Sequence, residues 1–278
     1  MTTQATKLVG NGILKGKKGL IMGIANDRSI AWGIAEACFN QGAELGFTYQ
    51  NDAFKKRVEP LVAGFGKPFL VECDATDEAA LDKTFSDIKE QWGDIDFLVH
   101  AIAFSNKDEL KGRYCDTTLE NFLNTMHISC YSFTSIARRA AEIMPRGGSL
   151  LTLTYIGSER VIPNYNVMGV AKAALESSVR YLAADLGAQN VRVHALSAGP
   201  MKTLAGSAIA NARYTFRTAE QTAALNRSVT MEDLGNSSVY LLSDMSAATS
   251  GEVHYIDAGF RAMGMLAPWR VEQDGVGE

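Results

Sequence analysis

Two phenols and one amine lie close together in the segment TYIGSERVIPNYNVMGVAK, which runs from Thr154 to Lys172. Tyr155 precedes Tyr165 by ten residues, and Lys172 follows Tyr165 by seven residues. A phenol, with a pKa of about 10, donates a hydrogen bond at neutral pH, and an ammonium lowers the cost of negative charge beside it. The segment therefore holds groups that could bind and protonate an oxygen that gains charge. The same spacing also fits a half-buried tyrosine and a surface lysine that have no catalytic role.

The elements around these residues predict how they lie. The apolar run SLLTLTY near residue 149 is typical of a buried strand. Pro163-Asn164 then precedes a helical pattern, so Asn164 is the expected N-cap and Tyr165 is expected in the first turn. Seven residues advance a helix by about two turns, which would put Lys172 on the same face as Tyr165 with about 10 Å of rise between them. A ribose lying there could contact both side chains.

Seven apolar, β-rich runs alternate with helical patterns along the 278 residues. The runs are almost continuously hydrophobic, as expected of parallel strands that are covered on both faces. We therefore predict an α/β fold, a Rossmann-like doubly wound parallel seven-stranded sheet with helices on both faces. With no repeat or linker in view, residues 1–278 are expected to form a single domain. The strands are expected near residues 19, 43, 68, 96, 149, 191 and 252.

The first strand-to-helix turn, GIANDRSIAWG from Gly23 to Gly33, has the features of a pyrophosphate site. Glycine permits close approach, and the N–H groups of the helix that opens near Ile30 would point at the anion. Ser29 could cap that helix or bond a phosphate oxygen directly. A capped turn without a ligand fits the same residues. The pattern GxxxxGK[ST] is absent from the sequence, which argues against a Walker-type site.

The ends of the next strands indicate which dinucleotide would bind. Gln50 stands where an acidic residue commonly bonds the ribose 2′-hydroxyl, and it can bond a hydroxyl without a charge of its own. We therefore favour NADH over NADPH. Asp74, followed by Ala75, could accept from the adenine amino group, although Asp74 could equally cap the helix that begins near Glu78. Ile102, on the fourth strand end, is expected beside the adenosine ribose.

The composition excludes several other classes of function. The formal net charge of −4 argues against a nucleic-acid partner, and no apolar run is long enough to insert into a membrane. The cysteines form no CxxC pair and fit a reducing cytoplasm, and the four histidines show no metal-ligand spacing. We therefore expect a cytoplasmic protein without a metal site.

Five motifs that span the chain from about Leu14 to Met263 carry a family resemblance. They are GIANDRSIAWGIA, GAELGFTYQND, TLTYIGSERVIPNYNVMGVAKAALE, VRVHALSAGPMKTLA and SGEVHYIDAGF. The chain resembles the short-chain dehydrogenase/reductase superfamily and, within it, the NADH-dependent enoyl-acyl-carrier-protein reductases of bacterial fatty-acid elongation. It lacks the superfamily's TGxxxGxG turn and its serine a dozen residues before the tyrosine, where Thr152 and Thr154 stand instead. The enoyl reductase branch shares both departures.

The resemblance implies a reaction and roles. NADH would give a hydride to the β-carbon of a trans-2-enoyl thioester, and Tyr165 would stabilise the enolate oxygen. Lys172 would hold the ribose, and Tyr155 would line the pocket. Met201 through Ala205 would wrap the nicotinamide and pyrophosphate. A homotetramer is expected from the family.

Together, the residues and the resemblance predict three sets of contacts. The catalytic residues are Tyr155, Tyr165 and Lys172. The cofactor is expected to contact Gly23, Ser29, Ile30, Gln50, Asp74, Ala75, Ile102, Lys172, Met201, Thr203 and Ala205. The enoyl-acyl-carrier-protein substrate is expected to contact Ser105, Tyr155, Tyr165, Met168 and Ile209.

Three alternatives stay open at this point. The alanine-rich segment of about residues 203–221 fits a mobile substrate lid, but also a plain amphipathic surface helix. The enzyme could instead be another short-chain reductase that acts on a ketone or a 3-ketoacyl thioester. The missing serine argues against this, because carbonyl reduction benefits from a second donor. A non-catalytic NAD-binding sensor would keep the same fold, and the intact tyrosine–lysine pair argues against that.

Overall fold

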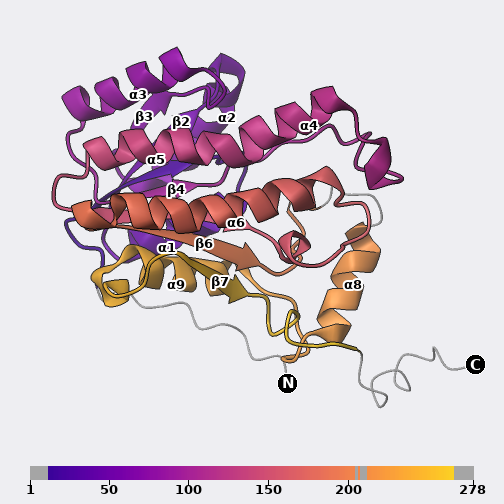
Figure 1. Cartoon of the computed structure of the whole chain (residues 1–278). Helices are drawn as coiled ribbons and strands as arrows, with labels where there is room; N and C mark the ends of the chain where they lie inside the picture. Colours follow the sequence, from indigo (N-terminus) through magenta and orange to yellow (C-terminus); the bar gives the residue numbers. More distant parts are fainter. Residues whose placement is uncertain (1–11, 204–205, 207–211, 266–278) are drawn as a thin grey trace, which may run out of the picture.

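The computed structural model describes residues 12–203, 206 and 212–265, and its centre is one seven-stranded sheet (Figure 1). Every neighbouring pair of strands is parallel, in the order β3-β2-β1-β4-β5-β6-β7. The predicted fold class is confirmed, and each strand lies where its apolar run was found. The strands are β1 (Lys18–Met22), β2 (Glu44–Tyr49), β3 (Phe69–Glu72), β4 (Phe97–His100), β5 (Gly148–Thr154), β6 (Val191–Ala198) and β7 (Glu252–Ile256).

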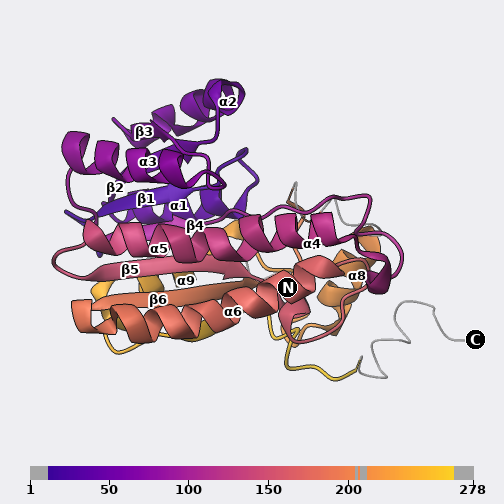
Figure 2. The same ribbon diagram turned by 45° about the horizontal axis from the view of Figure 1, so that its top comes forward.

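Helices cover both faces of the sheet, as Figures 1 and 2 show together. The helices are α1 (Ile30–Asn40), α2 (Asp52–Val62), α3 (Glu78–Gln91), α4 (Leu119–Met126), α5 (Ser132–Glu142), α6 (Val167–Leu186), α8 (Ala212–Thr222) and α9 (Met231–Leu242). Within β1, Leu20 and Met22 pack toward α3, α5 and α6, whereas Ile21 packs toward α1, α2 and α9. Successive side chains of a strand point to opposite faces, so a sheet covered on both sides needs an unbroken apolar run.

Short polar side chains set where several of these helices begin. Asn51, Asp77 and Thr118 cap α2, α3 and α4 by accepting backbone N–H groups of the first turn. Thr230 and Asp233 form a reciprocal capping box at the start of α9. A π-helical turn at His127–Tyr131 joins α4 to α5. Asp74 does not cap α3, because Asp77 does.

The predicted start of α6 is wrong by two residues, because the N-cap is Asn166 and not Asn164. Asn164 and Asn166 adopt left-handed φ angles of 65° and 41°, so the backbone turns there before it becomes helical. The helix begins at Val167, and Tyr165 lies in the turn that precedes it. The two side chains are therefore not stacked along one helix. Tyr165 reaches its position from a turn, while Lys172 projects from α6.

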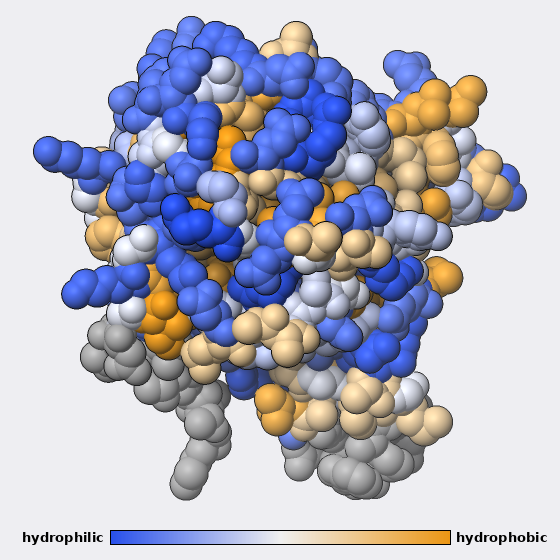
Figure 3. Space-filling view, turned by 60° about the vertical axis from the view of Figure 1, so that its left-hand side comes forward, coloured by the Kyte–Doolittle hydropathy of each residue, from blue (hydrophilic) through white to orange (hydrophobic). Residues whose placement is uncertain are grey.

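The sheet order reverses between β1 and β4, which opens a crevice at the carboxyl ends of the strands. The two strands separate only after Met22, whose carbonyl accepts from the N–H of Ala101 at 3.0 Å. Figure 3 shows the molecule turned so that the left-hand side of Figure 1 comes forward. This side lies away from the arrowheads of β6 and β7. Hydrophilic residues cover most of that face, and hydrophobic residues form separate small patches.

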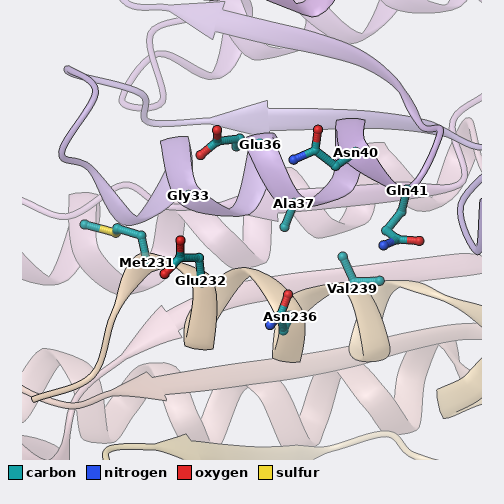
Figure 4. Close-up of a pocket in the computed structure, with 9 residues that line it drawn as sticks. All are labelled: Gly33, Glu36, Ala37, Asn40, Gln41, Met231, Glu232, Asn236 and Val239. Carbon is teal, nitrogen blue, oxygen red and sulfur yellow. The ribbon is translucent and has the colours of Figure 1, made fainter. Parts of the chain in front are cut away.

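A groove of ≈ 220 Å³ lies where α1 crosses α9 (Figure 4). Its apolar lining comes from Gly33 and Ala37 on α1 and from Met231 and Val239 on α9. The polar side chains around it are Glu36, Asn40, Gln41, Glu232 and Asn236. None of the residues predicted to do chemistry lines this groove. It results from the packing of two helices and is separate from the candidate site.

Candidate active site

A cavity of ≈ 700 Å³ lies at the carboxyl ends of β1, β4, β5 and β6. Its lining is mostly apolar, with a few polar groups, which is typical of a site for an organic cofactor or substrate. Eleven of the residues named from the sequence line it: Gly23, Ser29, Ile30, Ile102, Ser105, Tyr155, Tyr165, Met168, Lys172, Met201 and Thr203. Segments far apart in the sequence meet here because parallel strands end at one edge of the sheet.

Three predicted residues lie outside this cavity, and two others cannot be placed. Gln50 and Asp74 follow β2 and β3, and the Gln50 amide donates to the Asp74 carboxylate at 3.4 Å. Ala75 is buried beside them. Burial alone would raise the pKa of Asp74, but hydrogen bonds from Thr76 and Gln50 outweigh it and lower that pKa. Ala205 and Ile209 lie outside the described residues.

The turn after β1 brings a helix N-terminus to the cavity wall. Gly23 has a φ of +96°, and a Cβ there would lie 2.2 Å from the carbonyl oxygen of Ala101, so only glycine fits. Ser29 caps α1 by accepting the N–H of Trp32 at 3.3 Å, and its own hydroxyl donates to the carbonyl of Asn26 at 2.8 Å. Ser29 is thus the N-cap, and it also lines the cavity.

The two tyrosines form one edge-to-face pair inside the cavity. Their ring centroids are 5.0 Å apart, with the planes at 74°. Tyr165 is 8% exposed, and its ring lies against the backbone of Gly157, where a Cβ would approach Cδ1 of the ring to 2.4 Å. Gly169, on the first turn of α6, faces the carbonyl oxygen of Gly157, which a Cβ would approach to 2.6 Å. Two glycines therefore provide the room in which the Tyr165 ring lies.

Lys172 brings a buried cation to the same cavity. It is 6% exposed, and its Nζ donates to the carbonyl oxygen of Leu153 at 2.7 Å. Burial lowers the pKa of Lys172 to about 8, so the ammonium form still prevails at neutral pH. One or more of its remaining N–H donors can serve a ligand, because an ammonium has three.

Burial acts on the two phenols in the opposite direction. It raises the pKa of Tyr155 to about 12 and raises that of Tyr165 further, with a smaller contribution from the neighbouring phenol. Both tyrosines therefore keep their protons at neutral pH, and each hydroxyl can donate a hydrogen bond to an oxygen in the cavity.

Two buried polar groups behind the cavity were not singled out from the sequence. His100 bonds Thr152 at 3.1 Å through Nδ1 and Ser132 at 2.9 Å through Nε2, which ties β4 to β5 and α5. Burial lowers the pKa of His100 to about 3, so it is neutral. Glu176 on α6 is 6% exposed. A charged residue on the apolar side of a helical pattern is the signal that could have identified Glu176.

The loop after β4 is held at the cavity edge by hydroxyl and amide groups from α4 and the π-helical turn. Ser129 bonds the backbone N–H and carbonyl of Phe104, both at 3.0 Å. Asn121 accepts from the N–H of Asn106 at 3.0 Å, and Thr125 donates to Ser105 at 2.9 Å. The position of Ser105 is therefore fixed by a helix that is distant in sequence.

The polar groups of the site match the parts of a nicotinamide dinucleotide. The N-terminus of α1 offers backbone donors and a positive dipole end for a pyrophosphate. Ala101 and Ala103 leave room against the end of β4, and Thr203 and Lys172 supply donors at the inner end. The Gln50–Asp74 pair lies beyond, at the ends of β2 and β3. Among the described residues, no three His, Cys, Asp or Glu side chains are grouped to hold a metal ion.

Comparison with known proteins gives one consistent family. Residues 23–261 match the model of the enoyl-(acyl carrier protein) reductases. Enoyl-[acyl-carrier-protein] reductase [NADH] 1 of Rhizobium meliloti (strain 1021) is 58% identical over 257 residues, which cover 92% of this chain and 94% of that protein.

Solved structures agree with the sequence comparison. The crystal structure of the Anaplasma phagocytophilum enoyl-acyl-carrier-protein reductase in complex with NAD superposes with a TM-score of 0.89 at 49% identity, covering 95% of this chain and 98% of that one. The crystal structure of the Bacillus cereus enoyl-acyl-carrier-protein reductase with NADP⁺ and indole naphthyridinone superposes with a TM-score of 0.89 at 44% identity. The match covers 91% of this chain and 99% of that one. This chain belongs to the enoyl-acyl-carrier-protein reductase family.

Proposed function

We propose that this chain uses NADH to reduce the carbon–carbon double bond of trans-2-enoyl-acyl-carrier-protein thioesters, the last step of the fatty-acid elongation cycle. The observation that carries the proposal is the cavity in which Tyr155, Tyr165 and Lys172 meet the turn from Gly23 to Ile30. This arrangement puts two phenol donors and a cation beside a crevice suited to a dinucleotide. The Rhizobium meliloti relative is named as an NADH enzyme of the same activity.

When bound, the dinucleotide supplies a hydride to the β-carbon of the enoyl thioester. The residues of this chain handle the negative charge that develops on the thioester oxygen, and a proton taken up at the α-carbon then gives the saturated acyl chain. The Tyr165 hydroxyl donates to that oxygen and stabilises the enolate, an interaction typically worth about 3 kcal/mol or more. Tyr155 packs against the Tyr165 ring and lines the acyl pocket. Lys172 holds the ribose hydroxyls and, by its charge, favours the anion.

Reduction of a ketone is less well supported by the same geometry. The hydroxyl of Thr152 donates to the carbonyl of His100, and the hydroxyls of Thr154 and Ser158 donate to a buried carboxylate. These three groups are therefore engaged in the fold. A ketoreductase would need a second free donor at the carbonyl oxygen in this region.

The preference for NADH follows from the outer end of the crevice. Asp74 is an anion there, with a lowered pKa, and Gln50 donates to it. A 2′-phosphate would meet this carboxylate, whereas a 2′-hydroxyl can bond to either side chain. The proposal is thus NADH as the working cofactor, with NADPH bound more weakly.

Two further proposals concern a substrate lid and the oligomeric state. One is a lid over the acyl chain at about residues 203–221, of which 204–205 and 207–211 lie outside the described residues; Thr203 and Phe216 in the cavity lining support it. A homotetramer is supported by family membership and by the large apolar side chains that α4, the π-helical turn and α6 leave exposed. These are Leu119, Leu123, Tyr131 and Tyr181.

A cytoplasmic location fits the free cysteines Cys38, Cys73, Cys115 and Cys130. Within the described ranges, no helix is long and apolar enough to span a bilayer.

Light scattering on the purified protein tests the proposed homotetramer. A mass of four chains supports the homotetramer, and a mass of one chain contradicts it.

The reaction is tested by following NADH oxidation at 340 nm with crotonyl and acetoacetyl thioesters in parallel. Oxidation with the crotonyl thioester alone supports enoyl reduction. Faster oxidation with the acetoacetyl thioester would support a ketoreductase. Tight NADH binding without oxidation by either thioester would support a sensor.

A further inference from the structure

A buried carboxylate on α6 connects the segment that carries Tyr155 to the helix that carries Lys172. Glu176 is 6% exposed and lies one helical turn after Lys172. Its Oε1 accepts the hydroxyls of Thr154 and Ser158, each at 2.6 Å. Distances this short are typical of charge-assisted bonds from a hydroxyl to a carboxylate.

These two bonds hold both ends of one short segment. Thr154 is the last residue of β5, and Ser158 is the last residue of the 3₁₀ helix Ile156–Ser158. Tyr155 lies between them, and Gly157, against which the Tyr165 ring packs, lies there as well. A shift of this segment would therefore move both phenols.

Glu176 also acts on the cation through charge. Lys172 is bonded to the carbonyl of Leu153, the residue before Thr154, so the two charged groups hold adjacent residues of β5. Desolvation is the largest influence on Lys172 and lowers its pKa to about 8, while Cys130 and, to a smaller extent, the negative charge of Glu176 oppose that shift. Without this carboxylate the ammonium would lose its proton at a lower pH.

The other groups around this pair do not titrate near neutral pH. Burial lowers the pKa of His100 to about 3 and raises that of Cys130, and the pKa values of Tyr155, Tyr165 and Tyr255 are all raised, mainly by burial. Tyr255 bonds Glu159, which Arg261 pairs at 3.0 Å, and Arg180 on α6 is exposed. Among the described groups that face the pair, Lys172 is the one with a pKa of about 8.

We propose that Glu176 is a positioning residue for the reduction: its oxygen fixes the segment that carries Tyr155, and its negative charge, one helical turn from Lys172, favours the ammonium there. The inference rests on the proposed function. Neither role requires Glu176 to touch the substrate. The two roles use different properties of one side chain, so they can be separated by substitution.

Glu176→Gln tests the role of the charge, because glutamine keeps an acceptor oxygen and loses the negative charge. The readout is the affinity for NADH, measured by fluorescence titration from pH 6 to 10 without turnover. In the wild type the affinity should weaken above about pH 8, as Lys172 loses its proton. In Glu176→Gln the weakening should begin at a lower pH. Glu176→Asp, which retains the charge, should restore the wild-type pH dependence.

The double variant Thr154→Val/Ser158→Ala tests the role of the hydrogen bonds, because it removes both donors and leaves Glu176 in place. We expect kcat/KM for the enoyl thioester to fall roughly tenfold, the effect of about 1.4 kcal/mol. Asp185→Asn is the matched control, since it removes an exposed carboxylate from the same helix. It should change neither readout.

Three results would overturn the inference. In the first, the NADH affinity of Glu176→Gln depends on pH in the same way as that of the wild type. In the second, Asp185→Asn shifts this pH dependence as much as Glu176→Gln does. The third is an unchanged kcat/KM in the double variant, which also decides the matter if Glu176→Gln does not fold. If the wild type oxidised no NADH with any enoyl thioester, the proposed function would fail, while the binding titration would still report on Glu176 and Lys172.

Discussion

The rings of Tyr155 and Tyr165 meet edge to face, with centroids 5.0 Å apart, although the two residues come from different elements. Tyr155 directly follows β5, and Tyr165 lies in the turn before α6. Each ring limits the positions open to the other, so packing between the rings restricts where the two hydroxyls lie. The pair is a fixed feature of the fold and not two independent side chains.

Removing the Tyr165 hydroxyl should affect the chemical step. We expect Tyr165→Phe to lower kcat by roughly 10²- to 10³-fold, because a placed donor to the enolate oxygen is lost. NADH affinity should stay within about twofold, which fluorescence titration can check. Tyr114→Phe, an exposed tyrosine that does not line the cavity, is the control and should behave as wild type. A larger loss of kcat in Tyr155→Phe than in Tyr165→Phe would reverse the proposed roles.

A single methyl group at Gly157 should displace the Tyr165 ring. The Cβ of Gly157→Ala would lie 2.4 Å from that ring, so the ring or the segment must move. We expect kcat to fall at least tenfold with little change in NADH affinity. Gly187→Ala, at the end of α6, meets nothing within 4 Å and should leave kcat unchanged. Equal activity in both variants would show that the tyrosine is not held by this contact.

Replacing Lys172 should change how stability depends on pH and weaken cofactor binding. Its folded-state pKa of about 8 lies below the ordinary value of 10.5, so the folded state binds this proton less well than the unfolded chain, and the free energy of unfolding should rise as pH increases from about 8 to 10.5. Lys172→Met should lose this contribution to the rise. Urea unfolding across this pH range checks it, and an identical pH dependence in the variant and the wild type would contradict it. NADH affinity should fall at least tenfold.

Acid should destabilise the protein through His194. Neither ring nitrogen of this buried histidine has a hydrogen-bond partner, and burial lowers its pKa to about 4, with smaller contributions from Arg192 and His254. In the unfolded chain His194 binds a proton below about pH 6.5, whereas in the folded state it stays neutral down to about pH 4. The free energy of unfolding therefore falls as pH drops from 7 to 5. We expect this residue to account for a loss of about 2 kcal/mol over that range.

His194→Leu separates this contribution from the rest of the acid response. Urea unfolding at pH 7 and pH 5 should show a smaller difference in the variant than in the wild type. His254→Leu on β7 is the comparison, because His254 is not fully buried. An identical pH dependence in His194→Leu and the wild type would exclude His194 as the cause.

The proposed lid predicts a dependence on acyl chain length. Truncating Phe216, which lines the cavity from α8, should raise KM for long acyl chains more than for short ones, because the lost contact area lies along the chain. The same is expected for Ile209, which lies outside the described residues. Tyr214→Ala, on the same helix but 70% exposed, is the control. Equal increases in KM for crotonyl and dodecenoyl thioesters would contradict a lid that grips the chain.

The local pattern of the sequence was enough to predict the sheet and most of the residues at its edge. Continuous apolar runs determine that the strands are parallel and covered on both faces, and parallel strands bring residues such as Gly23 and Ile102 to one edge. The spacing of Tyr165 and Lys172 also predicted that both belong to one site, and both line the cavity. The reason given for it was wrong, because the left-handed backbone of Asn166 delays the helix.

Only the tertiary structure decided the contacts between distant segments. The bond between Gln50 and Asp74, the room that Gly157 gives the Tyr165 ring and the burial of Glu176 each depend on where a second element lies. Periodicity records which face of an element is covered, but not which side chain covers it. Hydrogen bonds and packing act over a few ångströms, so these relationships exist only once the chain has folded.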